Sequence, residues 1–271
     1  MRNITLLAAA GCMVLATSAQ AQDIADWSGF YAGVLAGYGL DRTQEESSSS
    51  IFPPTEVDDG LFYSGSSFSS QERIEGLVGG IGIGYNFQHD QFVLGLDGDV
   101  NFGQLDKTSA SSTFIRMEDE DDFFALGQGN ETTFGIDWYS TFALRAGVTF
   151  DGWLVYAKAG AAVGNVSSSS TSTISVDSNV GAAGPIPVPP GTYSSHAASS
   201  QLLFGPTFGI GAEKMLTPNI SVGAEYSYVG LPDVSIPQPN ALGGLFGGGA
   251  GDPIEVTSSI HVVKGSLKYH F

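Results

Sequence analysis

Apolar and polar positions alternate along much of the chain with a period of two, which indicates β-strands with two unlike faces. The clearest case is the stretch from residue 260 to residue 271. One set of alternate positions is apolar and ends in two aromatics, and the other set carries two lysines and a histidine. The two sets are Val263, Gly265, Leu267, Tyr269 and Phe271 against Lys264, Ser266, Lys268 and His270.

Seven further stretches also alternate between an apolar and a polar set of positions, so eight strands are predicted in all. The other seven cover approximately residues 27–40, 77–87, 92–102, 141–150, 153–163, 202–213 and 220–228. Short turns are predicted at residues 88–91, 151–152 and 217–219, and Asp151-Gly152 is a typical two-residue hairpin. The remaining segments are long, polar and rich in Ser, Gly and Pro, and they are predicted to be loops. These segments are residues 41–73, 106–133, 167–200 and 230–256.

The charged residues within the predicted strands all fall opposite the apolar set of their strand. In a soluble sandwich this charged face would point to water, whereas in a barrel closed on itself it lines the lumen. Four acids and four bases nearly cancel, which suits an interior where an unpaired charge is costly. By register, Glu225 is the nearest acid for Lys264 and Lys268. The predicted lumen network consists of Asp97, Asp99, Arg145, Lys158, Glu213, Glu225, Lys264 and Lys268.

Short turns that alternate with long loops and an even number of strands are typical of an all-β, eight-stranded antiparallel transmembrane up-and-down barrel. In such a barrel the turns and both termini are periplasmic, and the four long loops are extracellular. Aromatics near the periplasmic ends of the strands would form a girdle at the headgroups. These aromatics are Trp27, Phe30, Tyr85, Phe87, Phe150, Trp153, Tyr269 and Phe271. Periodicity alone leaves a soluble all-β protein open as an alternative.

The first residues indicate export and favour the membrane alternative. Arg2 precedes an apolar run from residue 4 to residue 15, and Ala19-Gln20-Ala21 is a typical cleavage site. We therefore predict a signal peptide over residues 1–21 and a single barrel domain over residues 22–271. The only cysteine, Cys12, lies in the predicted signal peptide.

Composition excludes some classes of function. The chain has 10 basic and 28 acidic residues and a formal net charge of −18, so the basic stripe that a nucleic-acid binder needs is missing. The acidic run at residues 118–122 could attract divalent cations, but it lacks the ligand spacing of a calcium loop. A solvated surface is the favoured interpretation, and neither a metal site nor a cofactor is predicted.

The two ends of the domain resemble a known family. The segment WSGFYAGVLAGYG at residues 27–39 and the closing HVVKGSLKYHF are similar to the opacity-like, porin-like small outer-membrane β-barrels of alphaproteobacteria, which are surface antigens. The resemblance implies an eight-stranded barrel in the outer membrane of a Gram-negative bacterium. It also implies that Tyr269 and Phe271, in the aromatic closing strand, serve as the signal that the barrel-assembly machinery recognises.

Three functions are compatible with this sequence. The first is a structural, surface-exposed role in envelope integrity and contact with the host or environment, with outer-membrane lipid and lipopolysaccharide as neighbours. The second is a narrow passive pore for small solutes. The third, an enzyme acting on lipid A, would depend on His261, near Glu255, Ser258 and Ser259. Successive strand residues point to opposite faces, so no catalytic residues are predicted. The sequence leaves the oligomeric state open.

Overall fold

The computed structural model describes residues 25–40, 47–57, 60–70, 75–119, 121–179, 189–239, 251–256 and 259–271. The predicted signal peptide, residues 1–21, lies outside these ranges, so its prediction stays untested. Within the described ranges there is no helix long and apolar enough to cross a membrane.

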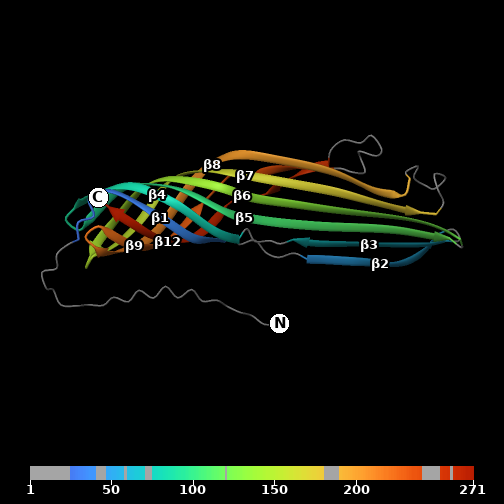
Figure 1. Ribbon diagram of the computed structural model, residues 1–271. Coiled ribbons are helices and arrows are strands. Elements are labelled where there is room, and N and C mark those ends of the chain that lie inside the picture. Colours follow the sequence, from blue (N-terminus) through green and yellow to red (C-terminus); the bar gives the residue numbers. More distant parts are fainter. Residues whose placement is uncertain are drawn as a thin grey trace.

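Eight strands close into a barrel (Figure 1). Each strand pairs antiparallel with the next one in the ring, and the last pairs with the first, from Tyr31 opposite His270 to Leu40 opposite His261. The predicted eight-stranded all-β barrel is confirmed, and closure leaves no free edge in its wall. The strands are β1 (Gly29–Leu40), β4 (Glu75–His89), β5 (Phe92–Asp119), β6 (Asp122–Phe150), β7 (Trp153–Ser178), β8 (Gly191–Thr217), β9 (Ile220–Val229) and β12 (Ile260–His270).

One end of the barrel, which we call the turn end, carries three two-residue connections. They lie at residues 90–91, 151–152 and 218–219. Asp151 and Gly152 have φ angles of 50° and 68°, and a type I′ hairpin needs this left-handed conformation at both central residues. The short predicted turns are therefore present where the sequence indicates them.

At the opposite end, four strands continue far beyond the barrel wall. The strands β5 to β8 have 28, 29, 26 and 27 residues, whereas a tilted strand crosses a bilayer in about 9–11 residues. Register shifts between Phe102 and Leu105 and between Ile136 and Trp138 mark the rim, because β-bulges concentrate at barrel rims.

Beyond the rim, β2 (Ser47–Val57) and β3 (Gly60–Ser70) form a hairpin that pairs with β5. The result is a six-stranded sheet in the order β2-β3-β5-β6-β7-β8. We call this part of the sheet the extension, and Figure 1 shows it projecting away from the barrel. It comprises residues 47–57, 60–70, 105–119, 122–136, 166–178 and 191–205.

The extension differs from the prediction of four long loops. Most of the segments at 41–73, 106–133 and 167–200 are strands, and the fourth segment contains the hairpin of β10 (Val234–Gln238) and β11 (Gly251–Val256). The signal was missed because Ser, Thr and Gly occupy both faces of these strands, so no apolar alternation marks them. The antiparallel ladder continues instead through backbone pairing and cross-strand hydroxyl bonds, such as Thr132 to Ser170 at 2.9 Å.

The barrel face turned away from the lumen is apolar and exposed. So large a continuous apolar belt on a barrel is suited to contact with lipid hydrocarbon. The belt includes Phe30, Val34, Ile81, Ile83, Leu94, Leu96, Phe142, Leu144, Phe208, Ile210 and Leu267.

The predicted aromatic girdle needs one correction. Seven of its eight members are 40% to 76% exposed on the outer face, but Trp27 is 0% exposed. Trp27 precedes β1 and is therefore not held to the alternation of a strand. Gly29, with a φ of 114°, adopts a conformation that favours glycine and allows the chain to turn inward. The Trp27 ring packs inside the turn end against His270.

Candidate functional site

The candidate site is the barrel lumen, where the structure brings together all eight charged residues that the sequence analysis selects. They come from six different strands, and none of their side chains is more than 11% exposed. The lumen therefore holds four carboxylates and four cations out of contact with bulk water.

Five of these residues form a group in the half of the lumen nearer the extension. The Nζ atom of Lys158 lies 3.0 Å from Asp97 Oδ1 and 2.9 Å from Glu225 Oε1. Lys264 Nζ lies 3.1 Å from Asp99 Oδ2 and 3.5 Å from Glu225 Oε1, and Lys158 also approaches Asp99 at 3.6 Å. Each lysine is thus shared between carboxylates, which offsets part of the cost of removing the charges from water.

The other three charges lie nearer the turn end. Arg145 Nη2 and Lys268 Nζ lie 3.2 Å and 2.7 Å from the same oxygen, Oε1 of Glu213. Tyr31 joins the two groups, because its hydroxyl accepts a hydrogen bond from Arg145 Nη1 at 3.0 Å and donates one to Asp97 Oδ2 at 2.7 Å. The eight charges therefore belong to one connected network.

Tyr156 provides a second connection. Its hydroxyl donates to Glu225 Oε2 at 2.9 Å, and the guanidinium carbon of Arg145 lies 4.1 Å from the centroid of its ring, which is a cation–π distance. Neither Tyr31 nor Tyr156 is among the lumen residues predicted from the sequence. The available signal was their position, since both lie on the same face of their strand as the charged or glycine residues.

The expected partners of the two lysines of β12 are correct only in part. Lys264 is opposite Glu225 in register and lies near it, but its shorter contact is with Asp99. Lys268 is paired with Glu213 rather than Glu225. Register predicts neighbours within a sheet, whereas long side chains in a narrow lumen also reach carboxylates on non-adjacent strands.

Glycines on β1 provide the space that these lysines need. Gly33 and Gly37 are opposite Lys268 and Lys264. A Cβ atom at Gly33 would lie 2.7 Å from Lys268 Cγ, and one at Gly37 would lie 2.9 Å from Lys264 Cγ. Both distances are shorter than the closest approach of two non-bonded carbon atoms. The absence of a side chain at Gly33 and Gly37 therefore lets each lysine stem cross the lumen.

Apolar clusters cover the network at both ends. The extension-end cluster includes Val78, Leu105, Phe134, Ile136, Tyr139, Val166, Leu231, Val234, Ile260 and Val262. The turn-end cluster consists of Trp27, Val93, Leu154 and Tyr156 with Ala25 and Met215 packed against it. Between them, a cavity of about 10 Å³ lies among the charged side chains, enough for roughly one water molecule. The described lumen is thus filled rather than open.

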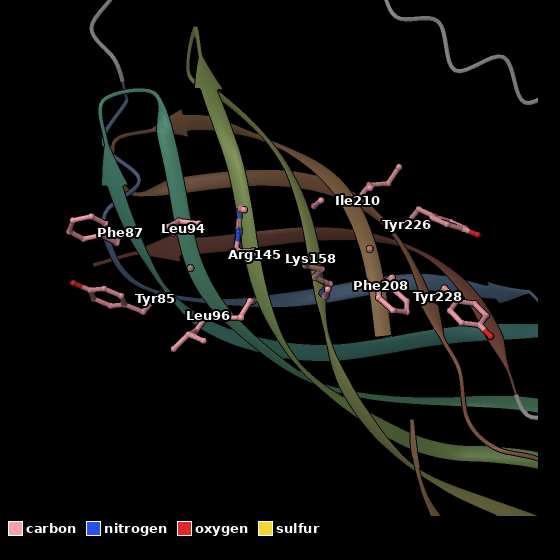
Figure 2. Close-up of a pocket in the computed structure, with 16 residues that line it drawn as sticks. Tyr85, Phe87, Leu94, Leu96, Arg145, Lys158, Phe208, Ile210, Tyr226 and Tyr228 are labelled. Carbon is pink, nitrogen blue, oxygen red and sulfur yellow. The ribbon is translucent and has the colours of Figure 1, made fainter. Parts of the chain in front are cut away.

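The outer wall carries a hollow of about 990 Å³ within the lipid-facing belt. In Figure 2, Tyr85 and Phe87 lie on one side of it and Tyr226 and Tyr228 on the other. Its lining is apolar, with small alanines of β6 and β7 between the larger side chains. Arg145 and Lys158 belong to the same part of the wall, but their side chains are buried in the lumen, so the hollow offers hydrocarbon contacts only.

The histidines lie in four separate places. His89 is exposed at the end of β4, His196 is hydrogen-bonded to Thr171 in the extension, and Nδ1 of His261 is 2.6 Å from the Tyr226 hydroxyl on the outer wall. His270 Nε2 is 2.9 Å from Ser221 Oγ, but both residues are buried beneath Trp27. A serine nucleophile must be reachable by its substrate, and Ser221 is not. Ser258 lies outside the described residues.

Sequence comparison identifies the family. A family model described as the outer membrane protein beta-barrel domain matches residues 7–271. The chain belongs to this family. Members of the outer membrane protein beta-barrel domain family reside in the outer membrane, and the apolar belt and the closed ring of strands of this chain agree with that location.

Curated relatives support the same assignment. The 31 kDa outer-membrane immunogenic protein of Brucella melitensis is 27% identical over 217 residues, which are 80% of this chain and 76% of that protein. The 22 kDa outer membrane protein of Rhizobium leguminosarum bv. viciae is 24% identical over 213 residues, 79% of this chain and 68% of that one. The resemblance to small alphaproteobacterial surface antigens is therefore confirmed.

Among solved structures, the chain is similar to Ail, the attachment invasion locus protein of Yersinia pestis. The TM-score is 0.34 at 13% identity, over 90% of this chain and 99% of that one. It is also similar to Neisserial surface protein A, with a TM-score of 0.31 at 13% identity, over 90% of this chain and 98% of that one.

Proposed function

We propose that the barrel is a closed membrane anchor that holds the extension at the cell surface, where the extension is the contact surface for the environment. The observation that carries this proposal is the continuation of β5 to β8 as a paired sheet well beyond the apolar belt. A paired sheet fixes its exposed residues more firmly than loops of the same length would. In this arrangement the turn end and both termini are periplasmic, as the short turns of outer-membrane barrels are.

Charge distribution supports the same orientation. The lumen network is neutral, so the described excess of acid lies elsewhere, about half of it on the extension and at its tip. Carboxylates at the tip include Glu118, Asp119, Asp121, Asp122 and Asp177. A charged surface of one sign resists association with the anionic surface of neighbouring cells and keeps the projecting sheet in solution.

Site-specific labelling tests the proposal, because the predicted mature chain has no cysteine. Ser175→Cys places a single thiol on the extension, and Gln91→Cys places one at the turn end. We expect a membrane-impermeant maleimide to label Ser175→Cys on intact cells and Gln91→Cys only after the outer membrane is permeabilised. Labelling in the opposite order would exclude the proposed orientation.

The alternative of a passive pore is less well supported, because apolar clusters cover both ends of the lumen and the charged interior is filled. We expect purified protein in planar bilayers to show no discrete conductance steps. Channels whose conductance changes on Arg145→Ala, in protein that keeps its folded mobility, would favour the pore.

We also infer that the chain is not an enzyme on lipid A, since the close pair of Ser221 and His270 is buried and His261 contacts tyrosines on the lipid-facing wall. Expression in a lipopolysaccharide-containing host should leave the lipid A mass spectrum unchanged. A new lipid A species that depends on His261 would contradict this inference.

A further inference from the structure

The two outer edges of the extension are built differently. On β2, Pro53 and Pro54 interrupt the edge, Glu56 follows them, and the pairing with β3 shifts register between Phe52 and Thr55. Prolines, charges and irregular register are the features by which sheet edges are protected from pairing with other chains. The β2 edge therefore carries several protecting features at once.

The edge formed by residues 191–204 of β8 carries none of these features. This stretch, which we call the β8 edge, contains no proline, lysine, arginine, aspartate or glutamate, and it pairs with β7 without a register shift. β9 pairs with β8 only from Thr207 onward. β10 lies against β7 and β8, but it pairs with β11 and not with either of them. Among the described residues, no strand pairs with the outer side of the β8 edge.

The direction of the free backbone groups follows from one hydrogen bond. Gly230 N–H donates to the carbonyl of Pro206 at 2.9 Å, so the backbone groups of residue 206 point to the side that β9 occupies. In an antiparallel ladder, the backbone groups of alternate residues point to opposite sides. Because the β7 ladder is regular, the N–H and C=O groups of Ser194, His196, Ala198 and Ser200 point to the unpaired side.

We propose that the β8 edge binds an extended segment of another protein, which adds antiparallel as a further strand of the sheet. The inference rests on the proposed function, since this edge must be outside the cell to meet such a partner. Main-chain hydrogen bonds would supply most of the affinity. Leu202 and Phe204 are exposed on the lipid-facing side, so the aqueous part of the edge is residues 191–201.

The side chains indicate what kind of segment fits. Ser194, Ser195, Ala197, Ala198 and Ser199 are small, so an added strand can lie close to the edge and cover it with larger side chains. Near the tip, Tyr193 packs with Ile174 and Val176. A matching segment is uncharged and carries β-branched or other apolar residues at alternate positions near the end that lies beside Tyr193.

A second copy of this chain is a less suitable occupant. Two copies in one membrane are related by an axis along the membrane normal, which makes their β8 strands run parallel and not antiparallel. Every strand pair in the described sheet is antiparallel, and parallel pairs are slightly less stable per residue. A segment free in solution can take either direction and therefore does not carry this restriction.

The test uses the full chain in lipid nanodiscs and a labelled, uncharged peptide that copies residues 167–176 of β7, the strand that already pairs with β8. Binding is followed by fluorescence anisotropy. We expect Ala198→Pro, which removes an N–H group from the unpaired side only, to weaken peptide binding by at least about tenfold. Ala198→Val keeps that N–H group, and its affinity should stay within about twofold of the original chain.

Two measurements make the outcome interpretable. Heat-modifiable gel mobility confirms that each variant is folded, and a peptide N-methylated at alternate residues tests the same hydrogen bonds on the unchanged protein. The proposal would be overturned if the peptide did not bind. It would also be overturned if Ala198→Pro bound the peptide as tightly as the original chain does and the methylated peptide bound as tightly as the unmethylated one. A dimer in sedimentation that Ala198→Pro converts to monomer would overturn it in favour of a second copy. Failed binding with correct surface labelling refutes the edge site alone, whereas reversed labelling refutes the proposed function.

Discussion

At the scale of single residues, the stability of the barrel depends on how many partners each buried charge has. Lys158 lies within ion-pair distance of three carboxylates, whereas Lys268 lies within that distance of one, Glu213, which also contacts Arg145. An uncompensated buried charge costs several kcal/mol, whereas a charge that keeps one partner costs less. The two lysines should therefore differ in their effect when each is replaced by an uncharged residue.

We predict that Lys158→Met lowers the free energy of unfolding by about 3–5 kcal/mol and that Lys268→Met lowers it by less. The physical reason is that Lys158→Met leaves Asp97 and Glu225 without their shortest ion pairs, while Arg145 still neutralises Glu213 in Lys268→Met. Urea unfolding in detergent micelles, followed by tryptophan fluorescence, measures both variants.

Lys107→Met is the matched control, because Lys107 lies on the extension outside the network. Its effect should stay within about 0.5 kcal/mol, as for most surface substitutions. Equal losses for Lys158→Met and Lys268→Met, or the reverse order, would show that the network does not act through its ion pairs.

At the scale of strands, the sequence predicts the barrel wall well and the extension poorly. In the wall, a residue such as Leu96 faces lipid and its neighbour Asp97 faces the lumen, so each strand has the period of two that the analysis detects. In the extension, buried positions of β7 such as Ser168 and Ser172 carry hydroxyl groups as their neighbours do, so no apolar set of positions contrasts with a polar set. Tyr31 and Tyr156 were missed for a related reason: an aromatic ring suits either face, and only the lumen geometry shows which partners it reaches.

The two-faced pattern that specifies the barrel is confined to the wall strands. We therefore infer that the wall folds without the outer part of the extension. Thr108 and Thr133 are opposite each other on β5 and β6, so an Asp-Gly turn can join them and replace residues 109–132. We predict that this shortened chain still forms a barrel. The deletion removes contacts beyond the rim, but it keeps every residue of the lumen network and of the apolar clusters at the two ends of the lumen. Heat-modifiable mobility in cold and boiled detergent samples is the measurement.

A control deletion removes part of the wall instead. Gly98 and Phe142 are also opposite each other on β5 and β6, and joining them by the same turn removes Asp99 and the rim. This variant should show no heat-modifiable form. If both deletions abolish the folded form, the extension is required for barrel formation and is not an independent projection.

At the scale of the whole molecule, the apolar belt and the charged lumen have separate roles. The lumen network and the apolar clusters stabilise the barrel once it is closed, whereas the aromatic side chains at the end of the chain are exposed on the lipid-facing wall. Tyr269 and Phe271 stack edge to face, with ring centroids 5.1 Å apart, and are 49% and 76% exposed. Their exposure leaves them available to another molecule before the barrel enters the membrane, and we propose that the barrel-assembly machinery recognises them.

Phe271→Ala separates assembly from stability. Because the ring of Phe271 is largely outside the packed interior, its removal should change the unfolding midpoint of the purified barrel little, while the amount of folded protein in the outer membrane falls severalfold. Leu267→Ala is the matched control, since Leu267 is an exposed apolar residue on the same face of β12, 50% exposed, and is not part of the aromatic pair. Membrane fractionation with heat-modifiable mobility gives the folded amount, and urea unfolding gives the stability. Normal membrane levels of Phe271→Ala, or an equal fall for Leu267→Ala, would mean that β12 is recognised by its general apolar face and not by its terminal aromatics.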